Sequence, residues 1–65
     1  MSELLSVKQA ATFVGLSVPT LNRMRVQGSG APYYKLGGQV RYDPAELEKW
    51  MRSRRFTSTS EEAAA

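Results

Sequence analysis

The sequence predicts an α+β fold that is mostly helical, in which three short helices carry a β-hairpin between the second and the third. Two observations support this prediction. Ser6, Ser17 and Asp43, residue types that commonly precede a helix, each stand before apolar residues at helical spacing. Residues 33–42 are aromatic and β-branched around a pair of glycines, which is typical of a hairpin. At 65 residues the chain forms one small domain.

The first helix is expected to begin at Ser6. The Ser6 side chain can accept from the Gln9 amide while the Gln9 side chain reaches back to Ser6, an arrangement known as a capping box. Small and β-branched apolar residues then recur at helical spacing. Gly15 can take the left-handed conformation that ends a helix, so this helix should have about two turns.

The second helix follows within a few residues. Ser17 is a strong N-terminal cap and Gly28 can end the helix. Leu21, Met24 and the stem of Arg25 form the expected inward stripe. Two helices joined by such a short turn form a helix-turn-helix, whose second helix can lie in the major groove of DNA.

Two registers are open to the hairpin around residues 37–38. A two-residue loop would pair Leu36 with Gln39 and would mix apolar and charged side chains on one face. A three-residue loop would pair Leu36 with Val40 instead. A slip of one residue moves all side chains of a strand to the other face, so the choice of register decides which residues face the core.

The three-residue loop is the expected one because its apolar face is continuous. It also pairs Tyr34 with Tyr42 and leaves Lys35 and Arg41 together on the opposite face. The hairpin would then be a lid on the core and a second surface for a partner.

The third helix is expected to begin after Asp43, with Pro44 at its first position. Leu47, Trp50 and Met51 continue at a spacing of three and four and should dock against the rest of the fold. We expect residues 1–5 to be an N-terminal extension, residues 6–55 the domain, and residues 56–65 a disordered, flexible tail with too little apolar surface to fold.

The composition excludes several kinds of protein and site. Without Cys or His the chain has no disulfide, no thiolate ligand and no imidazole base. No base stands near a nucleophile and no nucleotide-binding loop is present, so we expect no enzyme, cofactor, metal or small-molecule ligand. Apolar runs are short and the N-terminus does not resemble a signal peptide, so we expect a cytoplasmic protein without a membrane partner.

The charge is unevenly distributed. The net charge is +3, but residues 6–55 contain all nine basic residues and only three of the six acidic ones, a net charge of +6. A basic domain suits a polyanion such as nucleic acid or a membrane surface. The alternative is ordinary solubilising charge.

Candidate DNA contacts lie first on the second helix, on the side expected to face away from Leu21 and Met24. Asn can pair with adenine, Arg with guanine, and a helix N-terminus attracts phosphate. The alternative is an ordinary solvated face. The candidates here are Ser17, Val18, Pro19, Thr20, Asn22 and Arg23.

The hairpin supplies the other candidates. Lys35 and Arg41 could straddle a phosphate backbone or enter a minor groove, with Gln39 near the tip. Tyr33 could donate to a phosphate or pack under the loop. The alternative is a hairpin edge whose charges block aggregation. The arginines that end the third helix complement the helix dipole and could instead touch a phosphate.

The order of these elements is more specific than any one of them. It is a Ser-capped helix, a Gly-Leu-Ser turn, Thr20 and Arg23 in the second helix, Pro32 to Lys35, Val40-Arg41-Tyr42, and an Asp-capped helix with Leu47 and Trp50. Over residues 5–54 this pattern resembles the excisionase and AlpA-like small DNA-binding proteins of the MerR-like winged helix-turn-helix superfamily.

The resemblance implies a prokaryotic protein that binds double-stranded DNA through Ser17, Pro19, Thr20 and Arg23 in the major groove. It also implies that Lys35, Gln39 and Arg41 contact the backbone or the minor groove. Members of the family often carry a basic residue where Gly38 stands, so the hairpin should bind more weakly here.

Two roles are expected within that family. The first is a recombination directionality factor that bends DNA near an attachment site and assists a phage-type integrase, with cooperative self-association on DNA. The second is a regulator of transcription at a promoter. A protein-interaction adaptor whose basic face meets an acidic protein is the alternative from another class.

Overall fold

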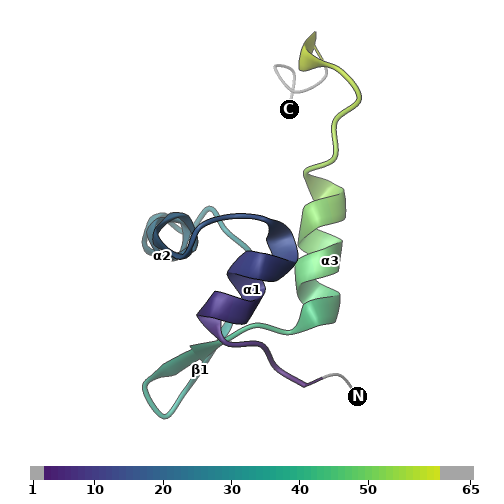
Figure 1. Cartoon of the computed structure of the whole chain (residues 1–65). Coiled ribbons are helices and arrows are strands. Elements are labelled where there is room, and N and C mark those ends of the chain that lie inside the picture. Colours follow the sequence, from purple (N-terminus) through teal and green to yellow (C-terminus); the bar gives the residue numbers. More distant parts are fainter. Residues whose placement is uncertain (1–2, 61–65) are drawn as a thin grey trace.

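The computed structural model describes residues 3–60, which form three helices and one two-stranded antiparallel hairpin (Figure 1). The hairpin lies between the second and third helices in sequence, so the predicted mostly helical α+β class is confirmed. The elements in chain order are α1 (Val7–Val14), α2 (Val18–Gln27), β1 (Tyr34–Leu36), β2 (Gln39–Arg41) and α3 (Pro44–Ser53).

All three helices begin where the capping residues predict. The Ser6 hydroxyl accepts from the Gln9 amide at 3.2 Å, and the Gln9 side chain accepts from the Ser6 amide at 2.9 Å, which completes the capping box. Ser17 and Asp43 cap α2 and α3 with their own side chains. Gly15 ends α1 at a φ of +76°, in the left-handed region that glycine adopts without strain.

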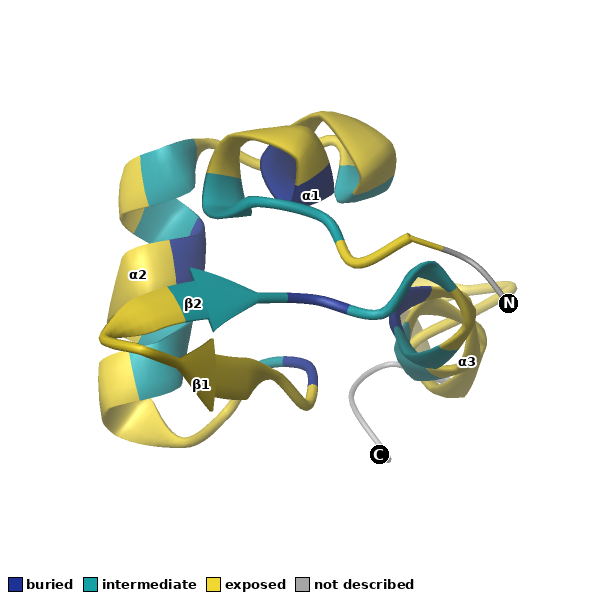
Figure 2. Ribbon diagram, turned by 90° about the horizontal axis from the view of Figure 1, so that it is seen from below, coloured by how far each residue is buried: buried dark blue, intermediate teal, exposed yellow. Residues whose placement is uncertain are grey.

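The core is small and α1 lies at its centre, in contact with both α2 and α3. Figure 2 shows the buried bands of α1, α2 and α3 turned toward one another. Leu47 of α3 is completely buried and Leu21 of α2 nearly so, and two alanines of α1 let these helices approach closely. The buried core residues are Ala10, Ala11, Leu21, Ala31, Tyr42 and Leu47.

The N-terminal segment pairs with the end of the hairpin. Leu5 donates its amide to the Tyr42 carbonyl at 2.6 Å and accepts from the Tyr42 amide at 2.8 Å. Tyr42 is 1% exposed, and Leu5 packs against the same core. This pairing holds the base of the hairpin on the helices.

The expected register of the hairpin is wrong. Leu36 pairs with Gln39 across a two-residue turn, Lys35 pairs with Val40, and Tyr34 pairs with Arg41 instead of Tyr42. Lys35 and Arg41 therefore lie on opposite faces of the hairpin, and the expected basic face is not formed.

The turn explains this register. Gly37 and Gly38 have φ angles of +56° and +82°, and two consecutive positive values are those of the tight turn that matches the twist of a two-residue hairpin. The expected apolar face does not form, because Tyr42 pairs with Leu5 and belongs to the core, whereas every residue of β1 is exposed. A short exposed hairpin buries too little side-chain surface to determine its own register.

The third helix packs almost as expected. Leu47 is fully buried and Trp50 packs against the core. Met51 is 39% exposed, so its predicted place in the core is wrong. A helix only ten residues long against a single neighbouring helix, α1, buries a narrow stripe, and Met51 lies beside that stripe.

Beyond α3 the described chain leads away from the three helices (Figure 1). Of the expected flexible tail, residues 61–65 lie outside the described residues, as do residues 1–2 of the expected N-terminal extension. The flexibility of the tail stays a prediction. Within residues 3–60 none of the helices combines the length and the apolar character needed to cross a bilayer.

Candidate nucleic-acid interface

The outer face of α2 exposes polar side chains that have no role in the core. Figure 2 shows the exposed side of α2 turned away from α1. Pro19, Asn22 and Arg23 are exposed there. Val18 is not part of this face: it is half-buried and packs against the core, so its expected orientation was wrong. Val18 stands three residues before Leu21, and residues three apart share one side of a helix.

The N-terminus of α2 is held by two hydroxyl groups. Ser17 Oγ and Thr20 Oγ1 lie 2.7 Å apart in a hydrogen bond, and Ser17 Oγ also accepts from the Thr20 amide at 3.2 Å. Both hydroxyls therefore stabilise the start of the helix. Any contact that they make with DNA would have to share or replace these bonds.

On the hairpin, Arg41 is folded back along its own strand. Its guanidinium donates to the Gln39 side chain and to the Val40 carbonyl, the latter at 2.8 Å. Gln39 and Arg41 share the face that also carries Tyr34. The two predicted contact residues near the tip therefore act as one hydrogen-bonded unit.

Lys35 lies on the other face and borders a hollow between α2 and the hairpin. The hollow has a volume of about 220 Å³. We call it the trough. It is lined by Arg25, Val26, Tyr33, Lys35 and Val40.

Arg25 links the two sides of the trough. Its Nη1 donates to the Tyr42 hydroxyl at 3.4 Å, and its guanidinium carbon lies 5.8 Å from the centre of the Tyr33 ring. The rings of Tyr33 and Tyr42 are 6.2 Å apart. From the sequence, only the aliphatic part of the Arg25 side chain was expected to have a role, beside Leu21 and Met24. The sequence feature that indicates a further role for Arg25 is its permanent charge on an otherwise apolar stripe.

A comparison with known protein families fits this architecture. The model of a helix-turn-helix domain family matches residues 4–55. The chain belongs to this helix-turn-helix domain family. Its membership implies that the protein binds DNA. No curated protein matches the chain.

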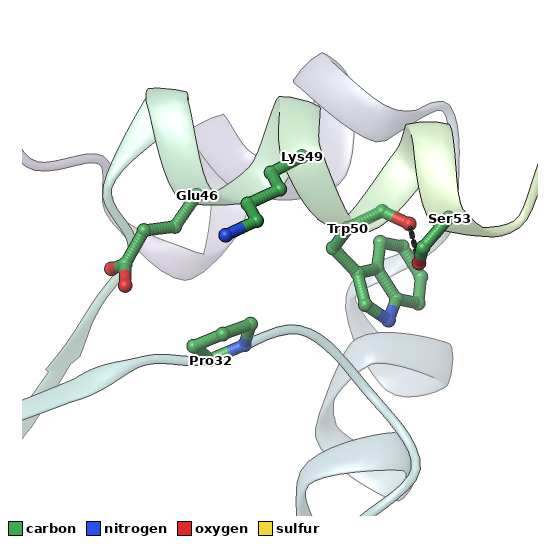
Figure 3. A pocket seen from close by; sticks show the side chains of 5 residues that line it. All are labelled: Pro32, Glu46, Lys49, Trp50 and Ser53. Carbon is green, nitrogen blue, oxygen red and sulfur yellow. Dashed lines mark hydrogen bonds between the residues drawn. The ribbon is translucent and has the colours of Figure 1, made fainter.

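The helix-turn-helix domain has a second hollow, of about 290 Å³, between α3 and the loop before β1 (Figure 3). Glu46 and Lys49 both line it, together with Pro32, Trp50 and Ser53. Because it contains both signs of charge, it does not favour a polyanion. The negative charge of Glu46 also raises the pKa of Tyr34 above its ordinary value.

Two of the arginines at the end of α3, Arg52 and Arg54, have side-chain contacts within the domain. Arg52 forms an ion pair with Glu48 at 2.7 Å. Arg54 donates to the Ser29 carbonyl at 3.0 Å and lies 5.7 Å from the centre of the Trp50 ring. These contacts give both residues a structural role. Within residues 3–60 no group of three or more acidic, His or Cys side chains could hold a metal ion.

Proposed function

We propose that the protein recognises a specific sequence of double-stranded DNA by placing the outer face of α2 in a major groove. The observation that carries this proposal is that Asn22 and Arg23 are exposed on that face of a helix-turn-helix domain. Their side chains can form paired hydrogen bonds with adenine and guanine. The protein then acts by binding and not by catalysis.

The contacts proposed for the rest of the surface follow from position. Pro19, Ser17 and Thr20 lie at the end of α2 that would enter the groove first, where helix amides attract phosphate. Gln39 and Arg41 would reach the adjacent backbone or minor groove from the tip of the hairpin.

The test measures affinity for duplexes that tile the DNA of the genetic element carrying this gene. The wild-type protein should prefer one segment. Arg23→Ala should lower that preference by roughly 1–3 kcal/mol if Arg23 pairs with a guanine. Arg52→Ala is the matched control, because Arg52 is exposed on α3 and bonded to Glu48. If Arg23→Ala changes neither affinity nor preference, α2 is not the recognition helix.

Within this activity, the proposed role is that of an excisionase, a recombination directionality factor that binds near an attachment site in a prokaryote. The support is the order of sequence elements, which resembles that of the excisionase and AlpA-like proteins of the MerR-like superfamily. The test adds the protein to a phage-type integrase from the same element and measures excision. An unchanged yield of excised product would reject this role.

One domain of this size covers a short stretch of DNA. Single modules bury about 600–1,000 Å² of protein surface, which favours several copies on adjacent direct repeats. We therefore propose cooperative binding by a protein that is monomeric in free solution. A stable symmetric dimer in sedimentation without DNA would contradict it.

Two alternatives differ in their observables. A promoter-binding regulator would change transcription from a reporter without affecting excision. An adaptor for an acidic protein would bind DNA without sequence preference. DNA binding should also lose affinity with salt at a logarithmic slope of about −0.9 per phosphate neutralised.

A further inference from the structure

The second hollow, between α3 and the loop before β1, contains a carboxylate that lacks a hydrogen-bond donor. Glu46 lines this hollow, and its Oε1 atom is buried without a hydrogen-bond partner among residues 3–60. A carboxylate removed from water is unfavourable unless a donor or a cation meets it. We propose that the second hollow is a docking site for a partner protein, which inserts one arginine side chain between Trp50 and Pro32 and pairs it with Glu46.

Within residues 3–60 no cation neutralises Glu46. Lys49 lines the same hollow, but no ion pair joins the two side chains, and Lys49 is exposed to solvent. Tyr34 lies near enough for the negative charge of Glu46 to raise the pKa of its hydroxyl, yet a neutral tyrosine does not compensate that charge. A cation supplied by another molecule would compensate it.

The walls of the second hollow suit a flat guanidinium group. Figure 3 shows Trp50 at one end of the hollow, Glu46 at the other, and the Pro32 ring between them on the loop. An arginine stacks on an aromatic ring and pairs with a carboxylate through two parallel N–H groups, whereas a lysine offers only a point charge. The volume of about 290 Å³ is at the low end for small-molecule sites, about 300–1,000 Å³, and therefore suits one long side chain.

The hollow is held in shape by contacts of the domain itself. Ala31, next to Pro32, is buried in the core, and Arg54 donates to the Ser29 carbonyl at 3.0 Å, which fixes the loop against the end of α3. The Ser53 hydroxyl donates to the carbonyl of Trp50 at 2.6 Å (Figure 3). A site that is formed in advance loses less conformational entropy when it binds.

The position of the hollow favours a protein as its occupant. In Figure 2, α2 and α3 lie on opposite sides of the molecule, so the second hollow is remote from the outer face of α2. A partner protein could therefore dock here while α2 lies on DNA, and it could extend its contacts along the exposed side of α3. This inference goes beyond the proposed function, because the hollow can bind its partner whether or not α2 recognises DNA.

The experiment follows the indole N–H resonance of Trp50, the only tryptophan of the chain, in nuclear magnetic resonance spectra of the full chain. The probe is the blocked peptide acetyl-Ala-Ala-Arg-Ala-Ala-amide, which should shift this resonance to saturation. The same peptide with citrulline, a neutral side chain of the same shape, should bind at least about tenfold more weakly. A lysine peptide should also bind more weakly, because an ammonium group lacks the planar fork.

Three variants of α3 provide the matched comparison. Glu46→Gln keeps the shape of the side chain and should weaken binding of the arginine peptide at least about tenfold. Glu48→Gln removes the same charge where Glu48 is paired with Arg52, and should leave the affinity unchanged. Lys49→Gln should not weaken binding, because Lys49 repels the incoming cation. Circular dichroism checks that Glu46→Gln remains folded; if it does not, the citrulline peptide tests the same contact on the wild type.

Several outcomes would overturn the docking site. An unmoved Trp50 resonance, or equal affinity for the arginine and citrulline peptides, would show that no guanidinium is recognised. An equal loss in Glu48→Gln would mean that the effect is one of net charge, and a loss in Lys49→Gln would mean that the hollow binds an anion. Free L-arginine, which has the same net charge as the peptide, should bind more weakly; tighter binding would make the occupant a small molecule. Duplex DNA is absent throughout, so failure of the proposed function is measured separately.

Discussion

The tight turn of the hairpin can be tested by replacing its glycines. Gly37 and Gly38 both have positive φ, and a Cβ atom at either position would meet nothing within 4 Å. The cost of alanine is therefore only that of the left-handed backbone, about 1 kcal/mol at each position. An isolated two-stranded hairpin is marginally stable, so Gly37→Ala should lower the equilibrium constant for its closure about fivefold. Gly37→Asn should be tolerated, because Asn-Gly is a favoured sequence for this turn.

Nuclear magnetic resonance can measure this effect. Residues flanking a two-residue turn form a hydrogen-bonded pair, and the next pair brings its α-carbons closest together. A strong Hα–Hα contact is therefore expected between Lys35 and Val40. It should weaken in Gly37→Ala and persist in Gly37→Asn. A contact between Leu36 and Val40 in its place, or equal behaviour of the two variants, would refute the two-residue turn.

Three further predictions concern the core, a helix cap and a titrating side chain. Leu47→Ala should lower the free energy of unfolding by about 2–5 kcal/mol, enough to unfold much of so small a domain in a urea titration; a loss below about 1 kcal/mol would contradict the packing. Ser6→Ala should cost about 1 kcal/mol in the same titration, because it breaks the capping box with Gln9; no loss would mean that the box is not formed in solution. The raised pKa of Tyr34 means that the folded state holds this proton longer, so stability should fall as pH rises above 10.0. Glu46→Gln should move the tyrosinate absorbance titration of Tyr34 back toward that value. Comparison with Tyr34→Phe identifies the part of the absorbance change that belongs to Tyr34. An unmoved titration would rule out Glu46 as the cause.

The revised hairpin changes which residues could act together. The expected pair of Lys35 and Arg41 on one face is replaced by two separate arrangements. Arg41 is bonded to Gln39 near the tip, whereas Lys35 faces the trough with Arg25. The domain therefore carries two separate sets of hydrogen-bond donors, Arg25 and Lys35 at the trough and Arg41 near the hairpin tip.

The sequence by itself determined the features that depend on neighbours in the chain. Ser6, Ser17 and Asp43 were identified as caps because a capping bond joins residues only two or three positions apart. Gly15 and Gly28 were identified as helix ends for the same reason. The order of helices and hairpin followed, and with it the helix-turn-helix.

Only the tertiary structure decided how these elements face one another. Tyr42 pairs with Leu5, 37 positions earlier in the chain, and no local pattern signals that contact. Tyr42 belongs to the core and pairs with Leu5, so it does not pair with Tyr34. The positive φ angles of Gly37 and Gly38 therefore set the register of the hairpin, and Lys35 lies on the face toward Arg25. The trough depends on that juxtaposition, since an arginine on α2 and a lysine on β1 line one hollow only because of where the tertiary structure places the hairpin relative to the helix.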